Sequence, residues 1–167
     1  IEDGTLHIHP QHHATASLTS RPLMTDQFRK DLTELPSRVD RLDSCLAPVT
    51  GRVFIKIDTE GFEAPVIRGS EAILTNVEAF AVMFEFSFAW QETSETLLPV
   101  FQFFNRLGAQ LFRITPHGLE HMRIYTTDME TVQYFNYVAI RDWPLGALTP
   151  TELATSYGST PFLRFAH

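Results

Sequence analysis

The sequence predicts an α/β domain built on a largely parallel sheet, with an antiparallel element near its C-terminal end. Strand-like apolar runs at 53–57 and 79–86 alternate with amphipathic helical segments at 62–74 and 94–107. Strand-like segments joined by short links then occupy most of 110–141. With 44% hydrophobic and 20% charged residues, the 167-residue chain has the composition of a globular domain, which argues against a disordered or fibrous protein.

The first forty residues predict short antiparallel strands. Residues 5–10 alternate in polarity and follow an Asp-Gly turn, which is typical of a half-exposed strand, and 15–19 can pair with them. Residues 20–32 are mixed and polar, and we expect a loop there. Residues 33–40 predict an edge strand, because Pro36 would remove one donor from a central one.

The middle of the chain predicts the core. A short helix at 41–47, ended by Pro48, precedes the apolar strand at 53–57, which only Lys56 interrupts. The helix predicted at 62–74 carries one apolar stripe, as expected for a helix that packs on a sheet. We expect helices to cover both faces of this strand.

The C-terminal part predicts further sheet strands and then irregular structure. The helix at 94–107 is followed by strands at 110–115 and 119–125, around a Pro-His-Gly turn, and at 134–141. The last 25 residues are rich in proline, glycine and threonine, which predicts an irregular tail packed on the same domain.

Net charge, apolar run length and cysteine content limit the classes of partner and the compartment that we expect. The net charge of -7 comes without a basic stripe, so we expect no nucleic-acid partner. No apolar run reaches the roughly 18 residues of a membrane span, so we expect none. Cys45, the single cysteine, cannot form an intramolecular disulfide, which predicts a cytoplasmic protein.

Charged residues stand where the predicted core strands end. Lys56 and Asp58 share one face of the first strand, and Glu85 interrupts the apolar run of the second. Because ligands bind at the carboxyl ends of parallel strands, we expect a Lys56–Glu85–Asp58 cluster at this crevice; a structural buried ion pair is the alternative. Glu60 fits a structural and a functional role equally well, whereas Glu63 in the first helical turn fits a structural role better.

The same stretch resembles a known family. The segment "FIKIDTEGFEAPVIRGSEAIL", preceded by "VDRLDSCL" and followed by "AVMFEFS", is similar to the FkbM-type methyltransferases. Nine residues between Lys56 and Arg68 match the family pattern in one register. Weaker similarity at "ATASL" and "FNYVAI" extends the resemblance over most of residues 1–141.

The resemblance implies an S-adenosylmethionine-dependent O-methyltransferase with a Rossmann-like class I sheet. It implies that Asp58 lies near the transferring methyl group or the acceptor hydroxyl, and that Glu60 and Gly61 shape the same cofactor-binding loop. Lys56 and Glu85 would support or polarise the site. The implied acceptor is a hydroxyl of a small-molecule, sugar or lipid-like compound, and the resemblance does not by itself support a divalent metal.

The resemblance covers only the C-terminal portion of the family's domain. Members normally begin with a strand and a glycine-rich cofactor loop, but no Gly-x-Gly triplet occurs in this sequence. The prediction is therefore a partial methyltransferase-like domain at 1–142 that lacks the first strands, with the tail at 143–167. A non-catalytic remnant or binding module is the alternative function, and an open sheet edge would suit a homo-oligomer or a missing N-terminal segment.

Two other features admit site hypotheses. His7, His9, His12 and His13 could bind a metal, although polar surface is the commoner role of such residues. Trp90 could cap an acceptor pocket or pack in an exposed loop.

Overall fold

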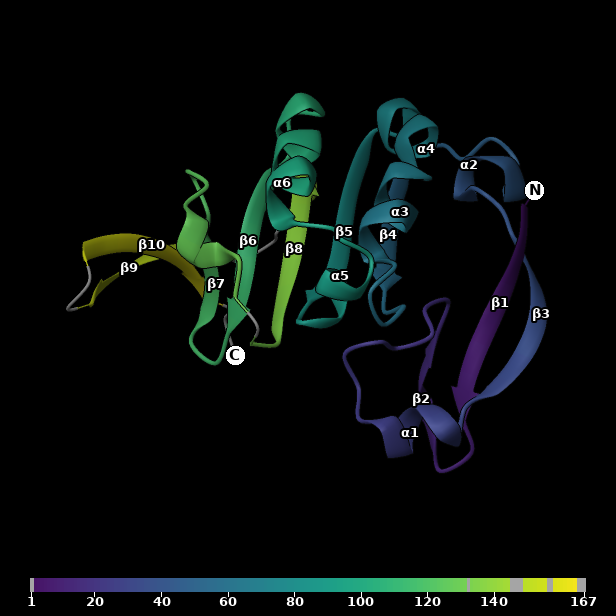
Figure 1. Cartoon of the computed structure of the whole chain (residues 1–167). Helices are drawn as coiled ribbons and strands as arrows, with labels where there is room; N and C mark the ends of the chain where they lie inside the picture. Colours follow the sequence, from purple (N-terminus) through teal and green to yellow (C-terminus); the bar gives the residue numbers. More distant parts are fainter. Residues whose placement is uncertain (1, 132, 145–148, 156–157, 165–167) are drawn as a thin grey trace.

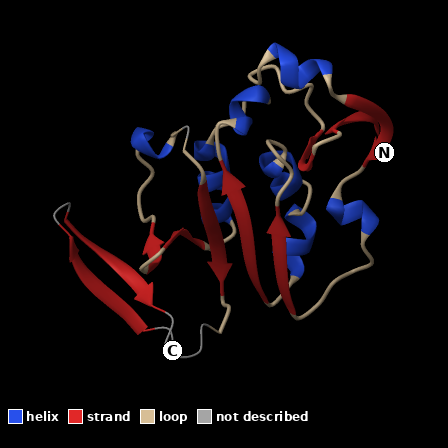
Figure 2. Cartoon of the chain, turned by 90° about the horizontal axis from the view of Figure 1, so that it is seen from below, coloured by secondary structure: helices blue, strands red, loops and turns tan. Residues whose placement is uncertain are grey.

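The structure is a computed structural model that describes residues 2–131, 133–144, 149–155 and 158–164. It contains two sheets (Figure 1). The smaller has the order β2-β1-β3 and is antiparallel throughout. The larger has the order β4-β5-β8-β6-β7-β10-β9. Seen from below, the β9–β10 hairpin and the three-stranded sheet lie at opposite ends of the molecule (Figure 2).

The elements follow the chain in an order close to the predicted one. The N-terminal part contains β1 (Glu2–His9), β2 (His12–Ser17), α1 (Asp26–Lys30), β3 (Thr33–Val39) and α2 (Leu42–Cys45). The central part contains β4 (Arg52–Ile57), α3 (Glu63–Arg68), α4 (Glu71–Asn76), β5 (Ala79–Phe86), α5 (Ala89–Glu92) and α6 (Leu97–Arg106). The C-terminal part contains β6 (Gln110–Thr115), β7 (Gly118–His121), the 3-10 helix η1 (Thr127–Met129), β8 (Phe135–Arg141), β9 (Thr149–Thr155) and β10 (Gly158–Arg164).

The α/β class is confirmed, and the predicted parallel character of the sheet is present only in part. β4 and β5 pair in parallel, whereas the other neighbouring strands of the larger sheet pair antiparallel. β4, β5 and β6 nevertheless run in one direction, because β5 and β6 are both antiparallel to β8, which lies between them. The predicted antiparallel strand near the C-terminal end is therefore present, inside the sheet.

The segment after residue 142 is not irregular where the structure describes it. β9 and β10 form an antiparallel hairpin, and β10 pairs with β7. The proline and glycine of this segment favoured the prediction of irregular structure. Its threonines, however, are common in strands, which agrees with the observed pairing. The division into a domain at 1–142 and a tail stays a prediction.

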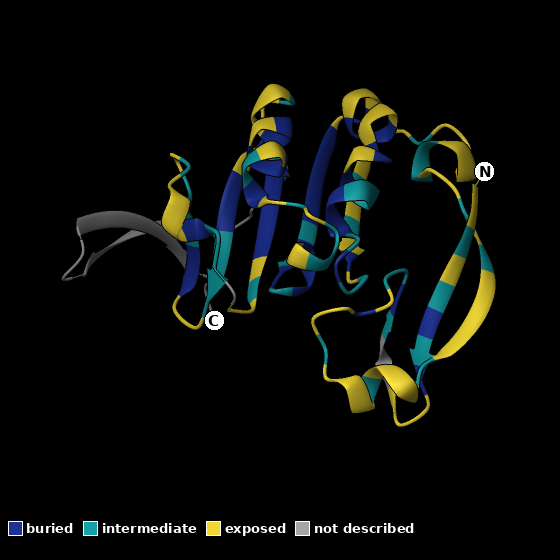
Figure 3. Ribbon diagram, viewed as in Figure 1, coloured by how far each residue is buried: buried dark blue, intermediate teal, exposed yellow. Residues whose placement is uncertain are grey.

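One face of the larger sheet carries the main core. Alternate residues of β5, namely Phe80, Val82, Phe84 and Phe86, pack with apolar residues of α3, α4, α5 and α6. These helices lie in front of the sheet in Figure 1. The central strands are buried, whereas β1 and β3 are largely intermediate or exposed (Figure 3).

The expectation that helices cover both faces of the strand at 53–57 is wrong. The opposite face of β4 is open, since Phe54 is 58% exposed and the Lys56 side chain 55%. β4 is an end strand of the larger sheet, and among the described residues its outer edge carries no paired strand. Lys56 therefore remains in water, which removes the desolvation cost expected of a buried lysine.

The helix predicted at 62–74 is two helices. Asp43 explains the break after α3, because its carboxylate accepts from the backbone amides of Ala72 (3.2 Å) and Ile73 (3.0 Å) at the start of α4. The Asp43 amide in turn donates to the carbonyl of Gly69 (3.0 Å). These contacts satisfy groups that a continuous helix would pair internally.

A distant carboxylate caps α6. Glu130 accepts from the amides of Leu97 (2.9 Å) and Leu98 (3.1 Å) and from the Tyr125 hydroxyl (2.8 Å). It thereby satisfies amides that have no partner inside the helix.

Glu130→Ala is expected to lower the free energy of unfolding by about 1–2 kcal/mol, because two helix N-terminal amides lose a charged acceptor. Urea unfolding followed by circular dichroism measures the change. Glu78→Ala, at an exposed glutamate, is the control and should stay within about 0.5 kcal/mol of wild type. Equal losses in the two variants would contradict the capping role.

Candidate active site

Two acidic residues, Asp58 and Glu85, lie next to Asn136 at the carboxyl ends of β4 and β5 and the start of β8. Asp58 follows β4 directly, one residue after the Ile57–Phe84 pair of the parallel register, and so lies level with Glu85. Glu85 is paired in turn with Asn136 of β8. Since the three residues have the same parity along their strands, they lie on the same face of the sheet, the face opposite the helices.

The predicted Lys56–Glu85–Asp58 cluster forms only in part. Lys56 Nζ lies 2.6 Å from Asp58 Oδ2, and both side chains are about half exposed. Between the described residues Lys56 and Glu85 no ion pair within 4.0 Å occurs, so the expected direct contact is absent. Because the Lys56–Asp58 pair is exposed, it contributes little to stability, and the structural alternative of a buried ion pair is also wrong.

The surroundings of Glu85 at this end of the sheet alter its acid–base behaviour. Partial burial, followed by the negative charges of Glu60, Asp58 and Glu63, raises the pKa of Glu85 from 4.5 to about 7, against a lowering effect of Lys56. A carboxyl group with a pKa near neutrality can exchange a proton with a substrate at working pH.

The loop after β4 is held in an unusual backbone conformation. Glu60 has φ 52° and Gly61 φ 105°, both in the left-handed region. A Cβ on Gly61 would lie 2.7 Å from the carbonyl oxygen of Ala89, so the loop and α5 approach too closely for any other residue. The Thr93 hydroxyl donates to the Gly61 carbonyl (2.9 Å). Such strain persists only where its surroundings fix it, and it is common at functional sites.

Glu63 has the structural role that its position favours. Its carboxylate is buried and accepts from the amides of Thr59 (2.8 Å) and Gly61 (3.0 Å). Burial raises the pKa of Glu63, and the two backbone hydrogen bonds oppose that shift. Glu63 thus closes the turn between β4 and α3.

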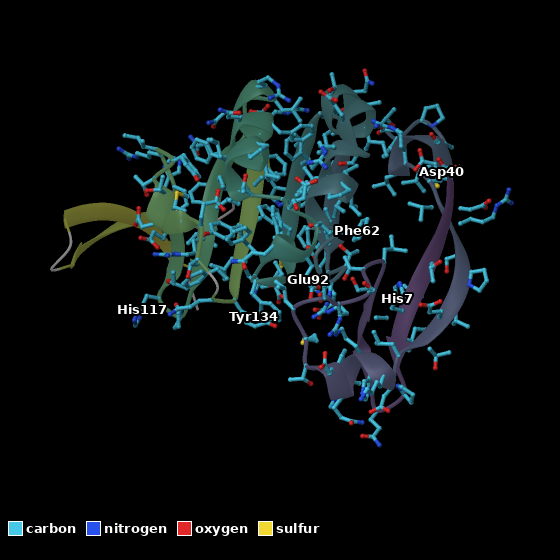
Figure 4. The ribbon with its side chains drawn as sticks, viewed as in Figure 1. His7, Asp40, Phe62, Glu92, His117 and Tyr134 are labelled. Carbon is cyan, nitrogen blue, oxygen red and sulfur yellow. The ribbon has the colours of Figure 1, made fainter. Side chains whose placement is uncertain are left out.

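Residues that the sequence did not single out complete the site. Arg21, in the predicted loop at 20–32, is fully buried and forms ion pairs with Glu60 and Glu92. Glu92 and Tyr134 lie at the same end of the sheet in Figure 4. Burial and the charges of Glu60 and Glu85 raise the pKa of Tyr134. No local pattern marks Arg21, because its partners are about 40 and 70 residues away in the sequence.

Other candidate site residues have different surroundings. Trp90 is buried between Phe84 and Phe86, so neither an acceptor cap nor exposed loop packing describes it. His7 and His9 are buried rather than on the surface. In the part of the chain that the structure describes, no three His, Cys, Asp or Glu side chains form a group that could hold a metal ion.

Asp58 at the candidate site is open to solvent, since its side chain is 52% exposed. A cavity of about 610 Å³ lies elsewhere, between the three-stranded sheet and α2 and α3, and its lining includes Leu18, Leu42, Phe62 and Val66. Asp58, Glu60 and Glu85 are not part of that lining. The candidate site lies at the strand ends, where the altered pKa of Glu85 and the strained loop at Glu60 and Gly61 are found.

Comparison with known proteins decides the family. A family model for the methyltransferase FkbM domain matches residues 3–111. The chain belongs to the FkbM methyltransferase family. The matched range contains Lys56, Asp58, Glu60, Gly61 and Glu85, so these candidate site residues lie within the family domain, whereas Tyr134 lies beyond it. No curated protein and no solved structure matches the chain.

Membership supports methyltransferase activity at the level of the family, as the sequence resemblance implied. No helix among the described residues is long and apolar enough to cross a membrane. The cytoplasmic compartment, the absence of a nucleic-acid partner and a homo-oligomer or further N-terminal segment stay predictions.

Proposed function

We propose that the chain is part of an S-adenosylmethionine-dependent O-methyltransferase that methylates a hydroxyl of a small-molecule, sugar or lipid-like acceptor. The observation that carries the proposal is Glu85, a carboxyl group with a pKa of about 7 beside Asp58 at the carboxyl ends of two parallel strands. A hydroxyl acceptor must lose its proton during methylation, and a base with this pKa can take it at neutral pH.

The described residues fit the positively charged end of the methyl donor. Asp58, Glu60 and Glu85 contribute negative charge to one region, as their mutual effect on the pKa of Glu85 indicates, and a sulfonium cation is attracted to such a region. S-Adenosylmethionine supplies the electrophilic methyl group when bound. We propose that Asp58, Glu60 and Gly61 hold this end of the donor. The sequence has no Gly-x-Gly loop for the rest of the donor.

We propose roles for these residues that differ from those the resemblance implied. Glu85 is the better general base, because its proton affinity matches neutral pH. Asp58 is half exposed and paired with Lys56, which suits a residue that orients the acceptor hydroxyl or faces the donor. Lys56 keeps Asp58 in place through this pair and lowers the pKa of Glu85.

Calorimetry separates this function from the alternative of a non-catalytic remnant. We expect the chain to bind S-adenosylmethionine at up to millimolar concentration, and Asp58→Asn to bind it more weakly, because one charge that attracts the sulfonium is lost, while its turnover falls by about tenfold or more. Asp26→Asn, in an exposed ion pair on α1, is the matched control and should change neither quantity. A protein that gives no binding heat at millimolar donor would overturn catalysis by this chain alone.

A further inference from the structure

The Arg21 side chain crosses from the N-terminal part of the chain to the candidate site. It is fully buried, and its Nη1 lies 3.2 Å from Glu60 Oε2 and 3.3 Å from the Glu60 carbonyl oxygen. Its Nε lies 3.2 Å from Oε2 of Glu92, whose side chain is also fully buried. One guanidinium thus joins the loop after β4 to α5, which follows β5.

The segment around Arg21 is fixed to the same two elements by uncharged groups. The Ser17 hydroxyl donates to the Glu60 carbonyl (2.8 Å). The Thr19 hydroxyl and the Leu23 amide donate to Glu92 (3.1 and 3.2 Å). Residues 17–23 therefore contact the Glu60 loop and α5 from the side of the three-stranded sheet.

Stability alone does not explain the burial of Arg21 with Glu60 and Glu92. Burying a guanidinium with two carboxylates removes several charges from water, and apolar side chains of similar volume often do as well or better. Arg21 also has a φ of 53°, and its buried Nη2 finds no hydrogen-bond partner among the described residues. At 3.2 Å, the Nε–Glu92 contact has ion-pair distance without hydrogen-bond geometry. Features of this kind occur where function requires a particular geometry.

The charge of Arg21 acts close to the acidic residues at the strand ends. The charges that act on Glu85 come from Glu60, Asp58 and Glu63, which raise its pKa, and from Lys56, which lowers it. Glu60 has the largest effect among these charges and is the residue that Arg21 holds. Arg21 also lowers the pKa of Tyr134, against the raising effects of burial, Glu60 and Glu85.

We propose that Arg21 is a positioning residue that fixes the Glu60 carboxylate relative to Glu85 and so makes the segment 17–23 a working part of the methyl-transfer site. This inference rests on the proposed function for its purpose, but its physical content is independent of methyl transfer. Arg21 acts through Glu60 and touches no reacting atom in this proposal.

Two substitutions separate the charge of Arg21 from its shape. Arg21→Gln removes the positive charge, so the titration midpoint of the Glu85 carboxyl, followed by carbon-13 NMR, should rise. Amide exchange of Thr59, Glu60 and Gly61 should become faster by on the order of tenfold, because the loop loses its anchor. Arg21→Lys keeps the charge without the planar fork, so the midpoint should return toward the wild-type value while exchange stays fast.

Arg29→Gln is the matched control, because Arg29 forms an exposed ion pair with Asp26 in the same part of the chain. It should leave the midpoint and the exchange rates unchanged. A folded Arg21→Gln with the wild-type midpoint overturns the proposal. If Arg21→Gln does not fold, Arg21→Lys decides, and wild-type exchange of the loop amides in that variant overturns it.

These measurements need neither donor nor acceptor. If the Arg21 variants shift Glu85 as expected in a protein that transfers no methyl group, the coupling is supported and the proposed function fails separately.

Discussion

Glu85→Gln is expected to slow methyl transfer by about 10²–10⁴-fold and, at the same time, to make the protein more stable at pH 8. The rate falls because glutamine keeps the shape of the side chain but cannot accept the acceptor's proton. The rate is measured with S-adenosylmethionine labelled in its methyl group and the hydroxyl compound that the wild-type protein methylates.

The stability effect has a defined pH window. The pKa of Glu85 is raised from 4.5 to about 7 in the folded protein, so the folded state keeps this proton to higher pH than the unfolded chain. The stabilising contribution of the Glu85 proton is therefore lost as the pH rises from about 4.5 to about 7, and the whole cost of the charged Glu85 is present above that range. Glutamine does not titrate, so the advantage of Glu85→Gln should be near zero at pH 4, grow through this window and level off above it.

Glu78→Gln is the control for both measurements, because Glu78 is exposed and lies just before β5, at the opposite end of that strand from Glu85. A residue whose removal stabilises the fold and stops the reaction is kept for function. A Glu85→Gln protein with the wild-type rate would show that another group takes the proton.

Gly61→Ala should lower the free energy of unfolding by about 2–4 kcal/mol. Two effects add. The φ of 105° is unfavourable for any residue with a Cβ, and the new methyl group would lie 2.7 Å from the Ala89 carbonyl oxygen. Because that oxygen belongs to the backbone of α5, the clash is relieved only by moving the helix or the loop.

Gly51→Ala isolates the second effect. Gly51 also has a positive φ, of 77°, but a Cβ there would meet nothing within 4 Å. We expect this control to lose only about 1–2 kcal/mol, the cost of the left-handed backbone alone. Guanidinium unfolding of both variants measures the difference. Equal losses would mean that the loop and α5 separate without cost, contrary to the packing described above.

The order of the elements and the place of the site follow from local sequence. Alternating apolar runs and helical stripes predict the succession of β4, the helices after it, β5, α6 and β6, because side-chain periodicity reports which faces are buried. Asp58, Glu60 and Glu85 could be placed at strand ends for the same reason. The FkbM motif between Lys56 and Arg68 is equally local, and the family match confirms the resemblance.

Strand pairing could not be read from the sequence in this way. The residues of β8 do not by themselves indicate that it lies between β5 and β6, because this pairing depends on contacts between segments that are distant in the sequence. The same holds for β10 beside β7, in a segment that local composition predicted to be irregular. The break between α3 and α4 depends on Asp43, a carboxylate about 30 residues earlier.

The sequence by itself determined the α/β class, the strand-end position of Asp58 and Glu85 and the family, because each depends on periodicity or on a contiguous motif. Tertiary structure decided which charges act on one another. Lys56 pairs with Asp58 on an open face, Arg21 reaches Glu60 from another part of the chain, and Glu85 acquires a pKa of about 7. Pairing and desolvation depend on distance and burial in space, and those quantities arise only when separate segments pack together.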